Sequence, residues 1–195
     1  MIYFLAVVTL LIFYHFFRLL GRGQFAWDNE GGKQQNFEFV DLADDSDQKI
    51  IQGQWATLKK IHNSLTSQAV MKDLVDVFEK IHAAFAQGVP SDIKNLVSKK
   101  IFEQFQKEIK QRKGYILHMY FLQPPQCFIK QIVVDEDKNC TIDTEFQSEQ
   151  LVYIEDKQGK IVDNPHKISE TVKNYWIFKK NLTNISSPWM LVEMV

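Results

Sequence analysis

The spacing of apolar residues changes along the chain and divides it into three parts. Residues 2–17 carry no formal charge and are nearly all apolar or aromatic, whereas residues 21–48 are rich in glycine, glutamine, asparagine and acidic residues. From Ile50 to Gly114 the apolar residues recur at helical spacing, and after Gly114 they fall into short runs. Consecutive helices followed by consecutive antiparallel strands predict an α+β domain, with helices packed on one face of a curved sheet.

Four helical periods are predicted in the first half of this domain. Apolar stripes cover residues 51–65 and 70–85, and Gly88 is expected to end the second helix. Pro90 opens a short third helix, and a fourth ends at Gly114. One face of each helix is therefore expected to point toward the core.

Strands are predicted in the second half, where short apolar runs are separated by turn signals. The runs cover residues 115–122, 127–139, 140–160, 172–182 and 187–194. The fourth run alternates, with Trp176 and Phe178 on one face, and Trp189 and Leu191 can share that face across a closing hairpin. The hairpin is interpreted first as part of the core. The pattern leaves open whether either tryptophan also lines a binding cavity.

The apolar run at the N-terminus predicts a single transmembrane anchor over residues 1–20. About 19 helical residues span about 28 Å, close to the roughly 30 Å of a bilayer core. A cleaved signal peptide and a soluble core helix are the alternatives. The basic residues follow the run, and the run lacks a small-residue cleavage site. Phe16, Phe17, Arg18 and Arg22 are therefore expected at the inner interface, with the rest of the chain on the cytoplasmic side.

A linker is predicted over residues 21–49, before the domain over residues 50–195. Its acidic residues outnumber its basic ones, and it has too few apolar residues to form a core. A flexible spacer is the simplest interpretation. The alternative is a partner-binding motif that uses Phe37, Phe39 and Val40 in an acidic context.

Charge is nearly balanced overall but is uneven along the chain. The formal net charge is −1, which argues against a nucleic-acid-binding protein. Between residues 94 and 113, however, basic residues outnumber Glu103 and Glu108. This candidate basic face consists of Lys94, Lys99, Lys100, Lys107, Lys110, Arg112 and Lys113. It is either a solvated helix face or a surface for anionic lipid or an acidic partner.

Catalytic motifs are not found in the sequence. It contains no glycine-rich phosphate loop, nucleophile elbow or zinc-binding helix motif, and the two cysteines are interpreted as reduced and intracellular. No catalytic residue, cofactor or metal is therefore expected. The alternative is a buried acid at the mouth of the sheet, as in some isomerases. The candidates for that role are Asp135, Asp143 and Glu145, beside His118 or Tyr153.

Two stretches carry a resemblance to a known family. The segment AFAQGVPSDIKNLVSKKIFEQFQKEIKQRKG, at residues 84–114, resembles the C-terminal domain of the Tim-forty-four family. The segment KISETVKNYWIFKKNLTNISSPWMLVEM, at residues 167–194, is similar to the closing hairpin of that domain. The resemblance covers residues 50–195 and implies an open cone of the nuclear-transport-factor-two type. An N-terminal span with an acidic linker is similar to the bacterial members, which are membrane-anchored adaptors.

The anchor, the charge pattern, the missing catalytic motifs and the resemblance together lead to three hypotheses about function. The first is a non-enzymatic adaptor of the bacterial inner membrane with its domain in the cytoplasm, or of the mitochondrial inner membrane with its domain in the matrix. It would hold a partner protein or an unfolded segment during translocation or membrane-protein assembly. The second is a module that binds anionic lipid through the basic face, and the third is a small-molecule binder or enzyme. Candidate core or pocket aromatics are Phe85, Phe102, Phe105, Trp176, Phe178 and Trp189.

Overall fold

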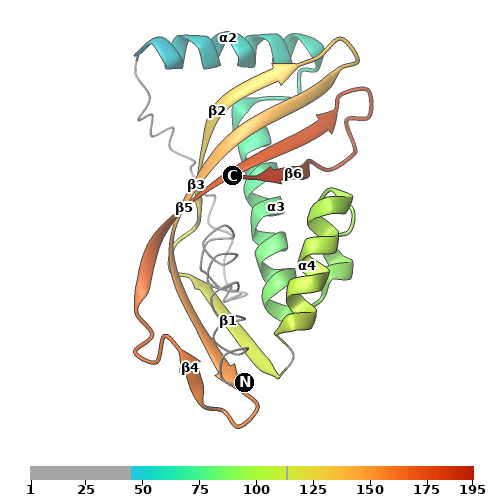
Figure 1. Cartoon of the computed structure of the whole chain (residues 1–195). Helices are drawn as coiled ribbons and strands as arrows, with labels where there is room; N and C mark the ends of the chain where they lie inside the picture. Colours follow the sequence, from blue (N-terminus) through green and yellow to red (C-terminus); the bar gives the residue numbers. More distant parts are fainter. Residues whose placement is uncertain (1–44, 113) are drawn as a thin grey trace.

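The computed structural model describes residues 45–112 and 114–195 of the chain (Figure 1). The predicted anchor over residues 1–20 and residues 21–44 of the predicted linker lie outside these ranges. The predicted interface residues also lie outside them: Phe16, Phe17, Arg18 and Arg22. The same is true of the predicted motif residues Phe37, Phe39 and Val40, and of Lys113 from the basic face. Within the described ranges, no helix is both long enough and apolar enough to cross a membrane.

The first half of the described chain is helical. The elements are α2 at Asp45–Ile61, α3 at Ser67–Gln87, the 3-10 helix η1 at Pro90–Ile93, and α4 at Lys99–Gln111. Helix α3 is capped at both ends: the hydroxyl of Thr66 accepts a hydrogen bond from the backbone N–H of Ala69, and Gly88 adopts a left-handed φ of 74°. The three longer predicted helices are therefore confirmed, although α2 begins at Asp45 rather than at Ile50, and the short third one is a 3-10 helix of four residues.

The second half forms one antiparallel sheet. Its strands are β1 at Tyr115–Phe121, β2 at Gln126–Val134, β3 at Asn139–Asp156, β4 at Ile161–Asp163, β5 at Ser169–Asn181 and β6 at Met190–Met194. On one side, β3 pairs with β2 along its first part and with β1 along its last part. On the other side it pairs with β5, which in turn pairs with β6. The α+β prediction is confirmed.

The sheet is strongly curved, and α3 and α4 lie on one side of it, while α2 runs past β2 at the end of the sheet (Figure 1). The register shifts between Ile129 and Gln131 in β2, and again between Ile177 and Phe178 in β5. Such irregularities bend a strand and increase its twist. Alternate residues of β3, among them Ile142 and Phe146, are fully buried because they face the helices.

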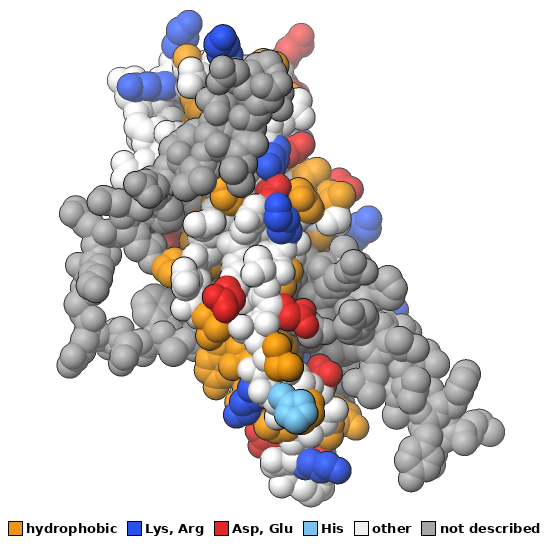
Figure 2. All heavy atoms as spheres, turned by 90° about the vertical axis from the view of Figure 1, so that its left-hand side faces the viewer, with side chains coloured by type: hydrophobic (Ala, Val, Ile, Leu, Met, Phe, Trp, Pro, Cys, Tyr) orange, Lys and Arg blue, Asp and Glu red, His pale blue; other side chains and the backbone are white. Residues whose placement is uncertain are grey.

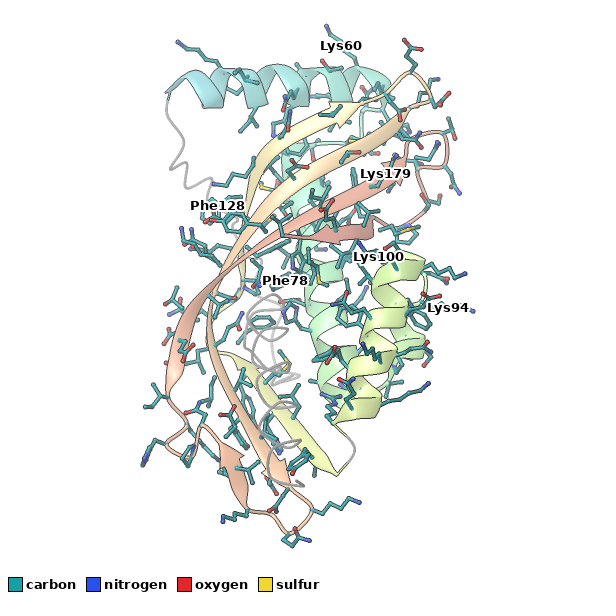
Figure 3. The ribbon with its side chains drawn as sticks, viewed as in Figure 1. Lys60, Phe78, Lys94, Lys100, Phe128 and Lys179 are labelled. Atoms are coloured by element: carbon teal, nitrogen blue, oxygen red, sulfur yellow. The ribbon has the colours of Figure 1, made fainter. Side chains whose placement is uncertain are left out.

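The closing hairpin is part of the core, as its alternation predicted. Trp176 and Trp189 are each only 1 % exposed, and Phe178 in β5 is paired with Leu191 in β6. The ring of Trp176 lies 4.7 Å from the ring of Phe78, centroid to centroid, and so joins the sheet to α3. Figure 3 shows Phe78 between α3 and the sheet. Aromatic packing across this interface therefore fixes the hairpin against the helices.

Two edge strands of the sheet, β2 and β6, are covered by other parts of the chain. The side-chain oxygen of Gln54 in α2 accepts a hydrogen bond of 2.8 Å from the backbone N–H of Ile132 in β2. The segment between η1 and α4 covers β6, because Leu191 donates to the carbonyl of Leu96 and accepts from the N–H of Ser98. Coverage of this kind satisfies backbone groups and prevents unwanted strand pairing.

Candidate functional site

Four lysines of α4 share one exposed side of the helix, and we call this the lysine face: Lys99, Lys100, Lys107 and Lys110. At 3.6 residues per turn they fall within an arc of about 100°. The opposite side of α4 is buried through Ile101 and Phe105. All four lysines are exposed, and so is Lys94, which precedes the helix and points outward in Figure 3. An amphipathic helix therefore presents concentrated positive charge to solvent.

Acidic side chains do little to neutralise the lysine face. Glu103 lies 3.9 Å from Lys99, but both side chains are more than half exposed, so the attraction is weak. Glu108, the other acid predicted here, is turned inward and is only 5 % exposed. Burial raises the pKa of its carboxyl group above the ordinary value. The face therefore keeps a net positive charge.

Arg112 does not belong to the basic face, and this part of the prediction is wrong. Its guanidinium is buried and donates hydrogen bonds to the carbonyls of Phe85 and Ala86 at the C-terminal end of α3. It also lies 4.9 Å from the centre of the Phe85 ring. Burial lowers the pKa of Arg112 to about 10, so the group stays protonated at neutral pH. The last carbonyls of a helix need donors, and Arg112 supplies them together with the backbone N–H groups of Gly88 and Val89.

The same contact explains the glycine at the end of α3. A Cβ atom at Gly88 would lie 3.2 Å from Nη2 of Arg112, and the residue also has a positive φ. Glycine thus satisfies both the left-handed turn and the close approach of the guanidinium. The sequence AFAQG and a distant arginine together form one helix-capping unit. Sequence reasoning identified the glycine but missed the arginine, because nothing local marks its partner.

The six candidate aromatics are packed as core residues. Phe102 is half-buried, and the other five are fully buried: Phe85, Phe105, Trp176, Phe178 and Trp189. Phe85 and Phe105 are in contact, with ring centroids 5.4 Å apart, which joins α3 to α4. Their regular spacing in the sequence is explained by their packing, because each of them faces the core. Binding of a ligand by any of them stays a prediction.

The acids considered for catalysis do not lie in the concave interior. Asp143, Glu145 and Tyr153 alternate with the inward-facing residues of β3, so they lie on the outer face of the sheet, away from α3. Asp135 lies in the β2–β3 turn and accepts hydrogen bonds from Asn139. His118 stacks on Tyr153 with ring centroids 4.4 Å apart. The expected position at the mouth of the sheet is therefore wrong for these residues, and catalysis stays a prediction.

An ion-pair cluster on the outer face was not foreseen from the sequence. The carboxylate of Glu145 lies 2.9 Å from the ammonium of Lys130 on β2 and 3.0 Å from that of Lys173 on β5. Burial alone would raise its pKa, but hydrogen bonds from Lys130, Lys173 and Gln147 lower it to about 2. The three charges lie on three adjacent strands, so only the register of the sheet brings them together.

Groups of three or more His, Cys, Asp or Glu side chains suited to a metal ion are not found in the part of the chain that the structure describes. Cys140 is buried and Cys127 is half-buried, and neither forms a disulfide. Burial raises the pKa of Cys140 to about 12, which keeps its thiol protonated. Neither a metal site nor a reactive cysteine is therefore indicated by the described residues.

Comparison with known proteins gives one family match. A family model described as a Tim44-like domain matches residues 38–195, which is well over half of the chain. The large ribosomal subunit protein mL45 of Drosophila melanogaster is 18 % identical over 178 residues, covering 90 % of this chain and 48 % of that protein. The chain thus spans about half the length of this curated relative.

A solved structure with a related outline is the intermembrane space region of the chloroplast protein ARC6. It is 10 % identical, covers 72 % of this chain and 94 % of that chain, and superposes with a TM-score of 0.40. A likeness at this level is too low to transfer a site or a function.

Proposed function

Because the chain belongs to the family with a Tim44-like domain, we propose that it is a membrane-associated, non-enzymatic adaptor or scaffold. It would hold a partner protein, or an unfolded segment of one, close to a bilayer during translocation or membrane-protein assembly. The observation that carries the proposal is the family match, which includes all of the described helices and strands. The relative mL45, named as a ribosomal subunit protein, also belongs to a larger assembly.

The distribution of buried and exposed groups supports an adaptor. The aromatic hairpin is used for the core, whereas the lysine face is free to meet a charged surface. Residues 21–44 separate the predicted anchor from α2. A flexible spacer, which the sequence predicts for this segment, would have an average end-to-end distance of about 25–30 Å at that length. The domain would therefore stay within reach of anything bound at the same membrane surface.

Proximity labelling of the full-length protein in its native membrane tests the proposal. We expect labelled proteins that take part in translocation or membrane-protein assembly, recovered reproducibly from independent preparations. A variant that lacks residues 1–20 is the control, because it keeps the domain but loses the predicted anchor. Labelling that is identical for both proteins, or confined to lipid, would contradict a membrane-held adaptor.

Binding of anionic lipid through the lysine face is a second candidate, favoured by the arc of four exposed lysines. Each basic residue near an anionic surface contributes about 1 kcal/mol. We therefore expect the double variant Lys99→Glu with Lys100→Glu to bind anionic vesicles at least tenfold more weakly. The matched control is Lys59→Glu with Lys60→Glu, which changes the same charge in the last turn of α2.

Salt provides the second arm of that experiment. Binding of the wild-type protein should weaken as salt is raised, since exposed charges are screened beyond about 10 Å at 0.1 M. The control pair should keep this salt dependence, and the α4 pair should lose most of it. Equal binding by the two double variants would remove the lysine face as a lipid-binding surface, while the adaptor proposal would stand.

A further inference from the structure

Strand β5 is much longer than the strand beside it. It covers Ser169–Asn181, whereas β6 pairs with it only from Trp176 to Lys179. The last backbone contact is the N–H of Val195, which donates to the carbonyl of Tyr175 at 2.9 Å. Backbone groups alternate along a strand, so those of Thr171 and Lys173 point to the same side as those of Tyr175. Within the described residues, no strand pairs with that side of β5 before Tyr175.

This first part of β5 is exposed to solvent. Thr171, Lys173 and Tyr175 are all exposed, and Val172 between them is half-buried. Figure 1 places this part of β5 at the left-hand margin, away from α3 and α4. Figure 2 looks at that side and shows white backbone and polar atoms at the surface beside hydrophobic side chains. This part of β5 therefore lies at a surface that another chain could reach.

Other edges of the sheet are treated differently. Gln54 covers the N–H of Ile132 in β2, and Leu96 and Ser98 bind both backbone groups of Leu191 in β6. Natural proteins also protect edges with lysine side chains that extend past them. Lys173 is the lysine of this edge, but its ammonium is held 3.0 Å from Glu145, over the outer face of the sheet. From residues 45–112 and 114–195, the backbone groups of Thr171 and Lys173 thus receive neither form of protection.

We propose that the edge of β5 at residues 169–173 is a binding site for an extended polypeptide segment, which adds to the sheet as a strand. The segment would occupy the place that a longer β6 would take. The N–H and carbonyl groups of Thr171 and Lys173 would form the new backbone hydrogen bonds. This inference rests on the proposed adaptor function and names the surface that holds the partner.

The surroundings of the edge indicate which segment it would accept. Ile168 is 63 % exposed at one end of the edge, and Tyr175 is 42 % exposed at the other. The apolar side chains of Ile168 and Tyr175 lie at the two ends, and the backbone groups available for pairing lie between them. This arrangement favours an unfolded segment that has apolar residues near both of its own ends. Main-chain hydrogen bonds make little distinction between sequences. The site therefore suits an adaptor that meets many unfolded clients rather than one folded partner.

Hydrogen exchange in the full-length protein in lipid nanodiscs tests the site directly. The probe is reduced, carboxymethylated α-lactalbumin, a soluble and permanently unfolded polypeptide. We expect the probe to slow exchange of the amides in residues 169–173, and to leave the amides of α4 unchanged. A probe that binds but slows exchange only elsewhere would overturn the edge proposal and leave the adaptor function intact.

A proline substitution gives an independent arm. Thr171→Pro removes one outward-pointing N–H, which pairs with no strand in the described part of the chain, and proline is tolerated on such edges. We expect up to about a tenfold loss of probe affinity, as for one missing backbone hydrogen bond. Thr171→Val is the matched control, because it keeps the N–H. Equal affinity of the two variants, or no binding of the probe by the wild-type protein, would overturn the proposal.

Discussion

The closing hairpin and helix α4 show how differently two conspicuous stretches of one sequence are used. The hairpin contains Trp176 and Trp189, yet both are buried and hold the sheet against the helices. Helix α4 buries Phe105 on one side and exposes the lysine face on the other. The stretch rich in aromatic residues therefore stabilises the core, whereas the stretch rich in lysines forms an exposed surface. The experiments below would break or sharpen this contrast, and they run from the largest expected change in stability to the smallest.

Truncating a hairpin tryptophan should have the largest effect. We expect Trp176→Ala to lower the free energy of unfolding by about 3–5 kcal/mol, because it leaves a cavity between the sheet and α3. Tyr175→Ala, at the next position and on the exposed face, should cost less than about 1 kcal/mol. Urea unfolding of both variants measures the difference. Similar losses at the two positions would show that the hairpin is not the core element described above.

Removing the guanidinium that caps α3 should come second. We expect Arg112→Met to lower the free energy of unfolding by about 2–3 kcal/mol, because the carbonyl of Ala86 loses its side-chain donor and the buried carbonyl of Phe85 keeps only the N–H of Gly88. Arg112→Lys should restore only part of the loss, since an ammonium lacks the planar fork of the guanidinium. Thermal unfolding of both variants measures this. If Arg112→Met left the free energy of unfolding unchanged, Arg112 would not cap α3 and would count again as part of the basic face.

The ion-pair cluster on the outer face should contribute less, and in a pH-dependent way. The pKa of Glu145 is lowered to about 2, so its stabilisation is complete above about pH 4.5 and is lost as the pH falls toward 2. We expect Glu145→Gln to cost about 1–2 kcal/mol at pH 6, since both lysines are half exposed.

At pH 2 the wild-type protein and Glu145→Gln should be nearly equal in stability. Urea unfolding at pH 6, 4 and 2 measures the convergence. Gln147→Ala is a useful comparison, because Gln147 donates to the same carboxylate without carrying a charge. A difference between wild type and Glu145→Gln that stays constant across this range would contradict the role of ionisation.

Reversing charge on the lysine face should have the smallest effect on stability. We expect Lys99→Glu with Lys100→Glu to change the free energy of unfolding by no more than about 0.5 kcal/mol, because both side chains are exposed and make no strong pair. Chemical denaturation measures this beside the vesicle experiment. A large loss of stability would mean that the lysines support the fold, and would weaken their interpretation as a binding surface.

The sequence predicted the order and type of elements well, because both depend on local periodicity. The alternation around Trp176 placed its side chain correctly, and Gly88 marked the end of α3 correctly. The candidate site was predicted less completely. The lysine face follows from helical spacing alone, whereas the position of Arg112 depends on a contact with residues 26 and 27 positions away.

Features that depend on strand register were beyond prediction. The cluster at Glu145 needs three strands in alignment, and the unpaired edge of β5 exists only because β6 is shorter. A periodic pattern gives the face on which a side chain lies, but it does not give the neighbour across the strand. The sequence did contain one indication of an unpaired edge, because the predicted strand at residues 172–182 is longer than the last one at residues 187–194.

The covering of β6 by Leu96 and Ser98 has a consequence for how the domain comes apart. Leu191 is bound on one side by β5 and on the other by the segment that leads into α4, across 95 positions of the chain. Loss of β6 would therefore release the start of α4, and loss of α4 would expose β6. The helical and stranded halves should behave as one cooperative unit, with a single unfolding transition rather than two.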